Sequence, residues 1–158
     1  DVYKRQVLYG PKDGAENFIE GLNLLSNMRL CANVPAQHVI PTALGGYQTI
    51  NDLVLPGGRL RGQRDVAYAG LSEIPGVSVN KAMGALYMFP KIDRDMYRIG
   101  TDEQFAFDLL RSKKILVTHG TGFNIPTHDH FRIVTLPDVE DLANAIDRIG
   151  DFLASIRR

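Results

Sequence analysis

The sequence has no tryptophan, a single cysteine and no excess of charge of either sign in its 158 residues. One cysteine cannot form an internal disulfide, so a reducing compartment is expected. Because 18 basic and 18 acidic side chains cancel, no net field attracts the chain to nucleic acid or to a membrane surface. No apolar run is long enough to span a bilayer, and no signal-peptide pattern is present. These absences favour a soluble, cytoplasmic protein.

The chain has enough apolar residues, 44% of the total, for one domain with a sizeable core. Apolar spacing, capping residues and breakers predict five helices: a face from Ala15 to Leu25, a segment from about Pro35 to Ala43, one from Arg59 to about Leu71, one that begins at Thr101, and one that begins near Asp138. Thr101 and Gln104 form a capping-box pattern, in which each side chain bonds the backbone of the other.

Runs of β-forming residues between these helices predict a small sheet. The expected strands are Val77–Lys81, Ala85–Phe89, Ile115–Thr118 and Phe131–Leu136, and a run at Val7–Tyr9 resembles the end of another. The turn at residues 82–84 predicts that the first two strands form a hairpin. From Val77 onward the order is strand, strand, helix, strand, strand, helix, which predicts an α/β fold with helices covering a small sheet.

The stretch HFRIVTLP alternates in the manner of a strand and contains a cation. Alternation places Arg132 on one face with Val134 and Leu136, in a strand that we expect helices to cover. A guanidinium keeps its charge, so burying it without an anion is costly, and its planar fork matches a carboxylate. Arg132 is therefore a candidate carboxylate-binding residue. The alternative is an arginine near a strand end that pairs with a local acid or reaches solvent.

Other polar or aromatic features carry weaker signals. The glycine-bearing stretch Gly120–Asn124 follows a strand, but no helix comes at once to bind a phosphate, so an ordinary turn is favoured. His119, His128 and His130 lie in the same loop, where solvated histidines are favoured over a metal site. Tyr87 is interpreted as a core aromatic with a polar end.

Five stretches in series resemble one family: NMRLCANVPAQHVI, LVLPGGRL with RDVAYAGL, IPGVSVNKAMGALYMFP, KILVTHGTGFN and DHFRIVTLP. Together they are similar to the C-terminal part of class I aminotransferases of pyridoxal-phosphate fold type I, and in particular to bacterial alanine aminotransferases. The resemblance runs from about Val7 to Arg158. It implies a homodimeric parent enzyme that uses pyridoxal 5'-phosphate to move an amino group between an amino acid, such as alanine or glutamate, and a 2-oxo acid.

The resemblance also implies how the chain divides. Residues 35–158 would be the small C-terminal domain with an interdomain helix, built as a small mixed sheet covered by helices. Residues 7–34 would be the end of the large cofactor-binding domain and an interface helix. The first six residues, DVYKRQ, match the translation of an adaptor used in sequencing libraries, and we expect them to be a non-native artefact.

The resemblance assigns few functional residues to this chain. The family's Schiff-base lysine precedes the landmark Gly10-Pro11-Lys12, and Lys4 lacks its motif. No catalytic, cofactor-binding or metal-binding residue is therefore assigned, and the chain alone is expected to be inactive. Arg132 matches the arginine that binds the substrate α-carboxylate, and Phe123 and Asn124 are secondary substrate-binding candidates.

Two readings without catalysis remain open. In the first, the chain is a stand-alone regulatory module that binds amino acids, with Arg132 as its carboxylate anchor. In the second, it is an interaction domain that binds no small molecule. The enzyme reading predicts that the reading frame continues upstream into a lysine-containing motif, whereas the module reading predicts that the natural chain starts near Val7.

Overall fold

The structure, a computed structural model, describes residues 13–29, 31 and 33–158. The chain forms two compact units, residues 1–48 and residues 49–158. The predictions made for DVYKRQ, for the strand at Val7–Tyr9 and for the landmark at Gly10-Pro11-Lys12 lie outside the described residues.

The described part of the first unit consists of two helices, as predicted. Helix α1 spans Glu16–Arg29, with an acid in its first turn and a base in its last, which suits the helix dipole. Helix α2 spans Val34–Gly45 and carries a proline in its first turn, where the missing N–H costs little. Neither helix contains a buried residue. Several large apolar side chains are exposed on them, among them Phe18, Leu25, Met28 and Leu44.

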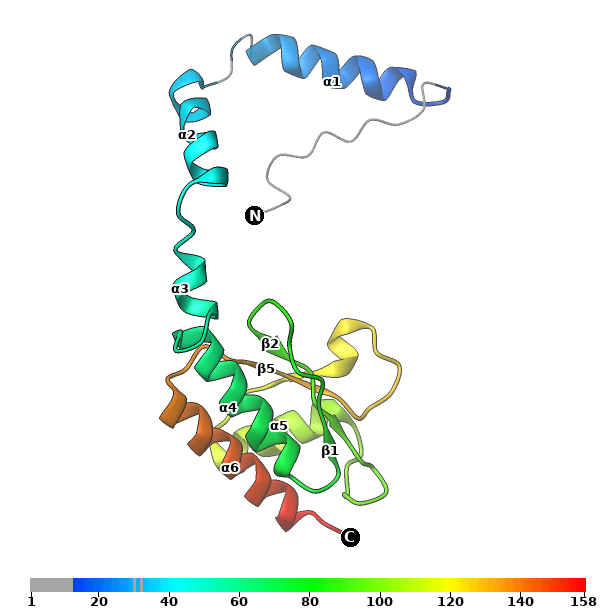
Figure 1. Cartoon of the computed structure of the whole chain (residues 1–158). Helices are drawn as coiled ribbons and strands as arrows, with labels where there is room; N and C mark the ends of the chain where they lie inside the picture. Colours follow the sequence, from blue (N-terminus) through cyan, green and yellow to red (C-terminus); the bar gives the residue numbers. More distant parts are fainter. Residues whose placement is uncertain (1–12, 30, 32) are drawn as a thin grey trace. The chain divides into compact units, whose positions relative to one another are not determined.

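The second unit contains four α-helices among the described residues. They are α3 (Ile50–Val54), α4 (Arg59–Glu73), α5 (Asp102–Lys113) and α6 (Val139–Ser155). Helices α4 and α6 pack side by side, and α5 packs against α6 (Figure 1). Helix α3 was not predicted, because five residues are too few to show apolar periodicity. In the described parts of the chain, no helix combines the length and the apolar character needed to cross a bilayer.

One of the two hydrogen bonds predicted for the cap of α5 is confirmed. The Thr101 hydroxyl accepts the Gln104 amide at 3.1 Å. The side chain of Gln104 does not reach back, because it donates to Asp108 one turn further along at 2.8 Å. The helix ends at Lys114, whose left-handed conformation (φ 57°) terminates the intrahelical bonding.

Five short strands make up the sheets of this unit: β1 (Val77–Ser78), β2 (Tyr87–Met88), β3 (Lys91–Ile92), β4 (Thr118–His119) and β5 (Phe131–Val134). β1 pairs with β3, and β5 lies between β2 and β4. The predicted hairpin between residues 77–81 and 85–89 is therefore wrong. Met88 and Ile92 are both apolar and both buried, and their strands have different partners. Met88 of β2 pairs with Ile133 of β5, and Ile92 of β3 pairs with Val77 of β1.

The expected α/β class with a small sheet under helices is confirmed, with one correction. The named strand pairs are all antiparallel, rather than mixed. β4 and β5 are joined by a short loop without a crossover helix, and such a connection produces an antiparallel pair. Both neighbours of β5 therefore run opposite to it.

The core lies on the face of β5 that carries Phe131 and Ile133, and helices α5 and α6 pack on it. Phe131 is fully buried and its ring contacts Phe105 of α5 at a centroid distance of 5.4 Å. Phe105 in turn contacts Phe152 of α6 at 5.7 Å. The predicted alternation along β5 is confirmed, and Arg132 is on the opposite face with Val134, which is 40% exposed. On that face Arg132 contacts the rings of Tyr87 and Phe123.

Candidate functional site

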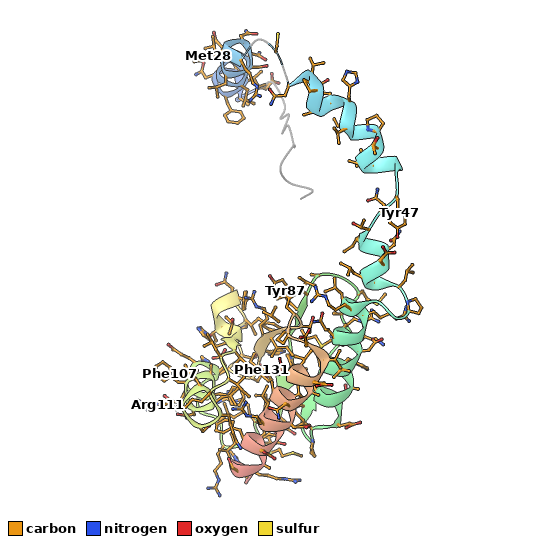
Figure 2. All side chains as sticks on the ribbon, turned by 90° about the vertical axis from the view of Figure 1, so that its left-hand side faces the viewer. Met28, Tyr47, Tyr87, Phe107, Arg111 and Phe131 are labelled. Carbon is orange, nitrogen blue, oxygen red and sulfur yellow. The ribbon has the colours of Figure 1, made fainter. Side chains whose placement is uncertain are left out.

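The candidate site is built around Arg132 on the open face of the sheet. Arg132 pairs with Thr118 of β4, while Tyr87 of β2 pairs with Val134, two residues further along β5. Side chains two residues apart on a strand share a face, so this register makes Tyr87 a diagonal neighbour of Arg132. In Figure 2, Tyr87 lies at the edge of the second unit, whereas Phe131 lies inside it.

Two aromatic rings hold the guanidinium of Arg132. Its Cζ atom lies 4.7 Å from the centre of the Tyr87 ring and 4.4 Å from the centre of the Phe123 ring. The rings come from β2 and from the turn that follows β4, the two strands that flank β5. Both distances are in the range of cation–π attraction. We call Tyr87, Arg132 and Phe123 the arginine clamp.

The clamp leaves the hydrogen-bonding capacity of Arg132 unused. Its Nε atom is buried and has no hydrogen-bond partner among the described residues. No described Asp or Glu forms an ion pair with it, whereas Arg61 and Arg64 both pair with Asp65. A buried donor without a partner costs about 1–3 kcal/mol. An arginine in this state is a ready binding group for a planar anion such as a carboxylate.

Phe123 is the last residue of a 3₁₀ turn, η1 (Gly120–Phe123), which is packed closely against the start of β5. A Cβ atom on Gly120 would lie 2.7 Å from the Cβ of His130, so only glycine fits there. The edge of the Phe123 ring meets Phe89 at a centroid distance of 5.7 Å, and Phe89 stacks on His130 at 5.4 Å. Phe123 is thus supported by a second ring besides its contact with Arg132, although it is 42% exposed.

The structure brings two of the three sequence-predicted candidates, Arg132 and Phe123, together and places the third, Asn124, elsewhere. Phe123 contacts Arg132 directly. Asn124 instead caps the turn in a left-handed conformation (φ 59°), and its amide donates to the Thr121 carbonyl at 3.1 Å. Its side chain is exposed and forms no described contact with Arg132.

The sequence did not identify Tyr87 as part of the site. Tyr87 was interpreted as a core aromatic, but it is 48% exposed and faces the guanidinium. Strand alternation explains the error, because the next residue, Met88, takes the buried position. That alternation could have identified Tyr87 if the register against β5 had been known.

The loop histidines are also placed differently from the prediction of solvated side chains. His128 Nδ1 lies 3.0 Å from Asp102 Oδ1, and His130 Nδ1 lies 2.5 Å from Asp129 Oδ1. Burial raises the pKa of Asp129, but hydrogen bonds from Thr127 and His130 outweigh it, so the pKa of this carboxyl is below its usual value. Within the described residues, no group of three or more His, Cys, Asp or Glu side chains could hold a metal ion.

Residues 9–149 match the model of the family described as aminotransferase class I and II. The chain belongs to this family. It is 63% identical over 152 residues to an alanine aminotransferase of Mycobacterium tuberculosis, covering 96% of this chain and 35% of that protein. It is 53% identical over 148 residues to the glutamate-pyruvate aminotransferase AlaA of Escherichia coli, covering 94% of this chain and 36% of that protein.

Solved structures agree with this assignment. An aminotransferase from Escherichia coli matches with a TM-score of 0.78 and 52% identity, covering 96% of this chain and 38% of that one. An alanine aminotransferase from Pyrococcus furiosus matches with a TM-score of 0.68 and 35% identity, covering 92% and 36% respectively. The expected fold is confirmed. The chain spans little more than a third of the length of the curated relatives named above.

Proposed function

We propose that this chain is part of an enzyme that transfers an amino group between an amino acid and a 2-oxo acid. Family membership and the names of the relatives support transamination, with alanine, glutamate and pyruvate as the substrates to test first. The observation that carries the proposal is the arginine clamp. It presents a half-buried guanidinium whose Nε atom is buried and which has no carboxylate partner among the described residues.

In this proposal Arg132 binds the carboxylate next to the reacting carbon. An amino acid and its 2-oxo acid share that carboxylate, so one anchor serves both directions of the reaction. Two parallel N–H···O bonds fix the carboxylate in the plane of the guanidinium. The rings of Tyr87 and Phe123 restrict rotation of the guanidinium, which keeps that plane fixed and orients the reacting carbon. Asn124 stays a candidate for a further polar contact with the substrate.

The family implies pyridoxal phosphate as the cofactor, which supplies the electron sink for the reaction. The described residues do not fit this group by themselves. Each of the four described lysines has a polar partner: Lys81 pairs with Asp65, Lys91 with Asp129 and Lys113 with Asp151, and Lys114 donates to the Arg111 carbonyl. None of them is placed as a free amine for covalent attachment, so we derive no step through the cofactor.

The organisation of the whole protein is part of the proposal. Residues 7–34 would belong to the large domain, and residues 35–158 would form the small domain with an interdomain helix. The exposed apolar side chains of α1 and α2, such as Leu25 and Leu44, would then pack against the rest of a cytoplasmic homodimer. The single cysteine and the balanced charge are consistent with that compartment.

The test uses a chimera in which the matched part of this chain replaces the corresponding part of the M. tuberculosis relative, below called the chimeric enzyme. An identity of 63% over 152 residues makes the exchange conservative. We expect it to catalyse transamination between alanine and 2-oxoglutarate. Arg132→Lys keeps the charge but loses the planar fork, so kcat/KM should fall on the order of 100-fold for both substrates.

Arg94→Lys is the matched control, because Arg94 is a loop residue whose side chain donates to the Gly100 carbonyl. It should leave kcat/KM unchanged within about twofold, since surface substitutions have small effects. The assignment of Arg132 is wrong if Arg132→Lys behaves like this control for both the amino acid and the 2-oxo acid. An inactive chimera that still binds alanine would favour a binding module without catalysis.

A further inference from the structure

The Phe123 side of the arginine clamp depends on a loop, in which the ring packs against Phe89 and the backbone is held by polar contacts. Phe123 belongs to the η1 turn between β4 and β5 rather than to a strand, unlike Tyr87 and Arg132. Its ring is 42% exposed, so burial alone fixes its position weakly. The contact with Phe89 supports the ring, and the turn that carries it needs contacts of its own if the ring is to stay 4.4 Å from the guanidinium.

A buried carboxylate at the start of α5 holds this turn. Asp102 is only 2% exposed, which is unusual for an aspartate. Its Oδ2 atom accepts the Thr121 amide at 2.6 Å, and its Oδ1 atom accepts the Thr121 hydroxyl at 3.1 Å. Thr121 is two residues before Phe123 in the same short turn. The carboxylate therefore fixes the backbone that carries the ring.

The same carboxylate also holds the far end of the loop. Asp102 Oδ1 lies 3.0 Å from Nδ1 of His128, which is seven positions beyond Thr121. The Glu103 amide of α5 completes its contacts at 3.1 Å. Asp102 thus bonds to both ends of the segment that contains Phe123. Burial raises the pKa of Asp102, but the bonds from His128 and Thr121 outweigh it, so the pKa is lowered and the group is charged at neutral pH.

Asp102 makes no described contact with Arg132, Tyr87 or Phe123 themselves. Any influence on the guanidinium therefore passes through the turn. Gly120 adds to this coupling, because its amide donates to the His130 carbonyl at 2.9 Å and its missing side chain allows close packing there. A turn tied to α5 on one side and to β5 on the other can shift Phe123 only by breaking charged hydrogen bonds.

We propose that Asp102 is a positioning residue for the arginine clamp: by holding the Thr121 backbone and His128, it keeps Phe123 against the Arg132 guanidinium and so tunes carboxylate affinity. This inference rests on the proposed role of Arg132 and extends it to a residue about 30 positions earlier in the chain. It identifies the buried α5 carboxylate as a determinant of substrate affinity without any contact to substrate.

The first variant is Asp102→Asn in the chimeric enzyme. An asparagine has one acceptor oxygen and one donor NH₂ group. One of the loop contacts would therefore bring two hydrogen-bond donors together, and that bond would be lost. We expect KM for alanine and for pyruvate to rise by the same factor, roughly tenfold, with kcat changed less than twofold. Asp108→Asn is the matched control on the same helix, because Asp108 is exposed and accepts from Gln104. It should leave both constants unchanged.

A double-variant cycle separates positioning from a general loss of structure. Because Asp102 is proposed to act through the ring, Asp102→Asn should have little further effect on KM once Phe123→Ala has removed that ring. A purely structural role would lower stability and yield in both backgrounds and would leave the KM ratio additive. Additive effects, or an unchanged KM in Asp102→Asn, overturn the proposal.

A milder variant covers the case in which Asp102→Asn does not fold. Thr121→Val removes the hydroxyl bond to Asp102 and keeps the stronger amide bond. KM should then rise about threefold, and Thr121→Ser should restore it. If Thr121→Val leaves KM unchanged, the proposal fails.

Arg132→Lys, measured in parallel, distinguishes the two claims. Loss of affinity in Arg132→Lys with none in Asp102→Asn and Thr121→Val refutes only the role of Asp102. No loss in Arg132→Lys refutes the carboxylate anchor itself.

Discussion

The two faces of β5 differ in burial and in chemistry. On one face, Phe131 and Ile133 are buried among rings and aliphatic side chains from the helices. On the other face, Arg132 lies between two half-exposed rings with a buried donor that has no described partner. Adjacent residues of one strand therefore lie in different environments. One face forms the core, and the other leaves a buried donor without a described partner, at some cost in stability.

The rings explain how that cost is limited. A carboxylate partner would stabilise Arg132 but would also occupy its donors. Aromatic faces attract the cation by about 0.5–2 kcal/mol and use none of its N–H groups. That is similar in size to the penalty of one unsatisfied buried donor, about 1–3 kcal/mol. The arginine clamp thus offsets much of the desolvation while the fork stays available for a ligand.

The largest expected effect tests the core face. Phe131→Ala removes a fully buried ring that contacts Phe105, and the loss should be about 3–5 kcal/mol in the free energy of unfolding. Urea unfolding of the chain measures it. Leu116→Ala, at a side chain that is 78% exposed, is the control and should change the free energy by less than about 0.5 kcal/mol. A loss below about 1 kcal/mol for Phe131→Ala would mean that this face is not the core.

The second prediction concerns the pH dependence of the loop that supports the clamp. The pKa values of Asp102 and Asp129 are lowered from the usual 3.8, so their contribution to stability is present above that pH and is lost as pH falls through the folded-state values. The free energy of unfolding should therefore fall more steeply below pH 3.8 in the wild type than in Asp102→Asn. Urea titrations at several acidic pH values compare the two slopes. Parallel curves would contradict the lowered pKa of Asp102.

The smallest expected effect tests the open face. Arg132→Met removes the unpaired donor and keeps an unbranched side chain between the rings. The free energy of unfolding should change by less than about 1 kcal/mol, in contrast to Phe131→Ala, because no hydrogen bond is lost. The same urea experiment measures it. A loss above about 3 kcal/mol would show that Arg132 stabilises the fold, and the two faces would then not differ in this respect.

Local patterns in the sequence predicted most elements of this fold. Strand alternation separated Phe131 from Arg132, and the cap at Thr101 marked the start of α5. Pairing partners were not predictable in the same way, because β3 is two residues long and its pairing with β1 depends on tertiary contacts. Alternation also separates the two faces of β5 without saying which of them the helices cover.

The residues at the centre of the candidate site could be predicted, but those around it could not. Arg132 and Phe123 were predicted from residue chemistry and from the family resemblance. Tyr87 and Asp102 reach the site only through the β2–β5 register and through hydrogen bonds that span 19 and 26 positions. Such long-range contacts leave no periodic signal in a single sequence.

The most direct test of the carboxylate anchor compares the affinity of the chimeric enzyme for L-alanine with its affinity for L-alaninamide, in which a neutral carboxamide replaces the carboxylate. The wild type should bind alanine more tightly by on the order of 100-fold, since a charged bidentate pair is involved. In Arg132→Met the ratio of the two dissociation constants should fall towards one. A ratio that stays at its wild-type value in Arg132→Met would contradict the central claim that this guanidinium recognises the substrate carboxylate.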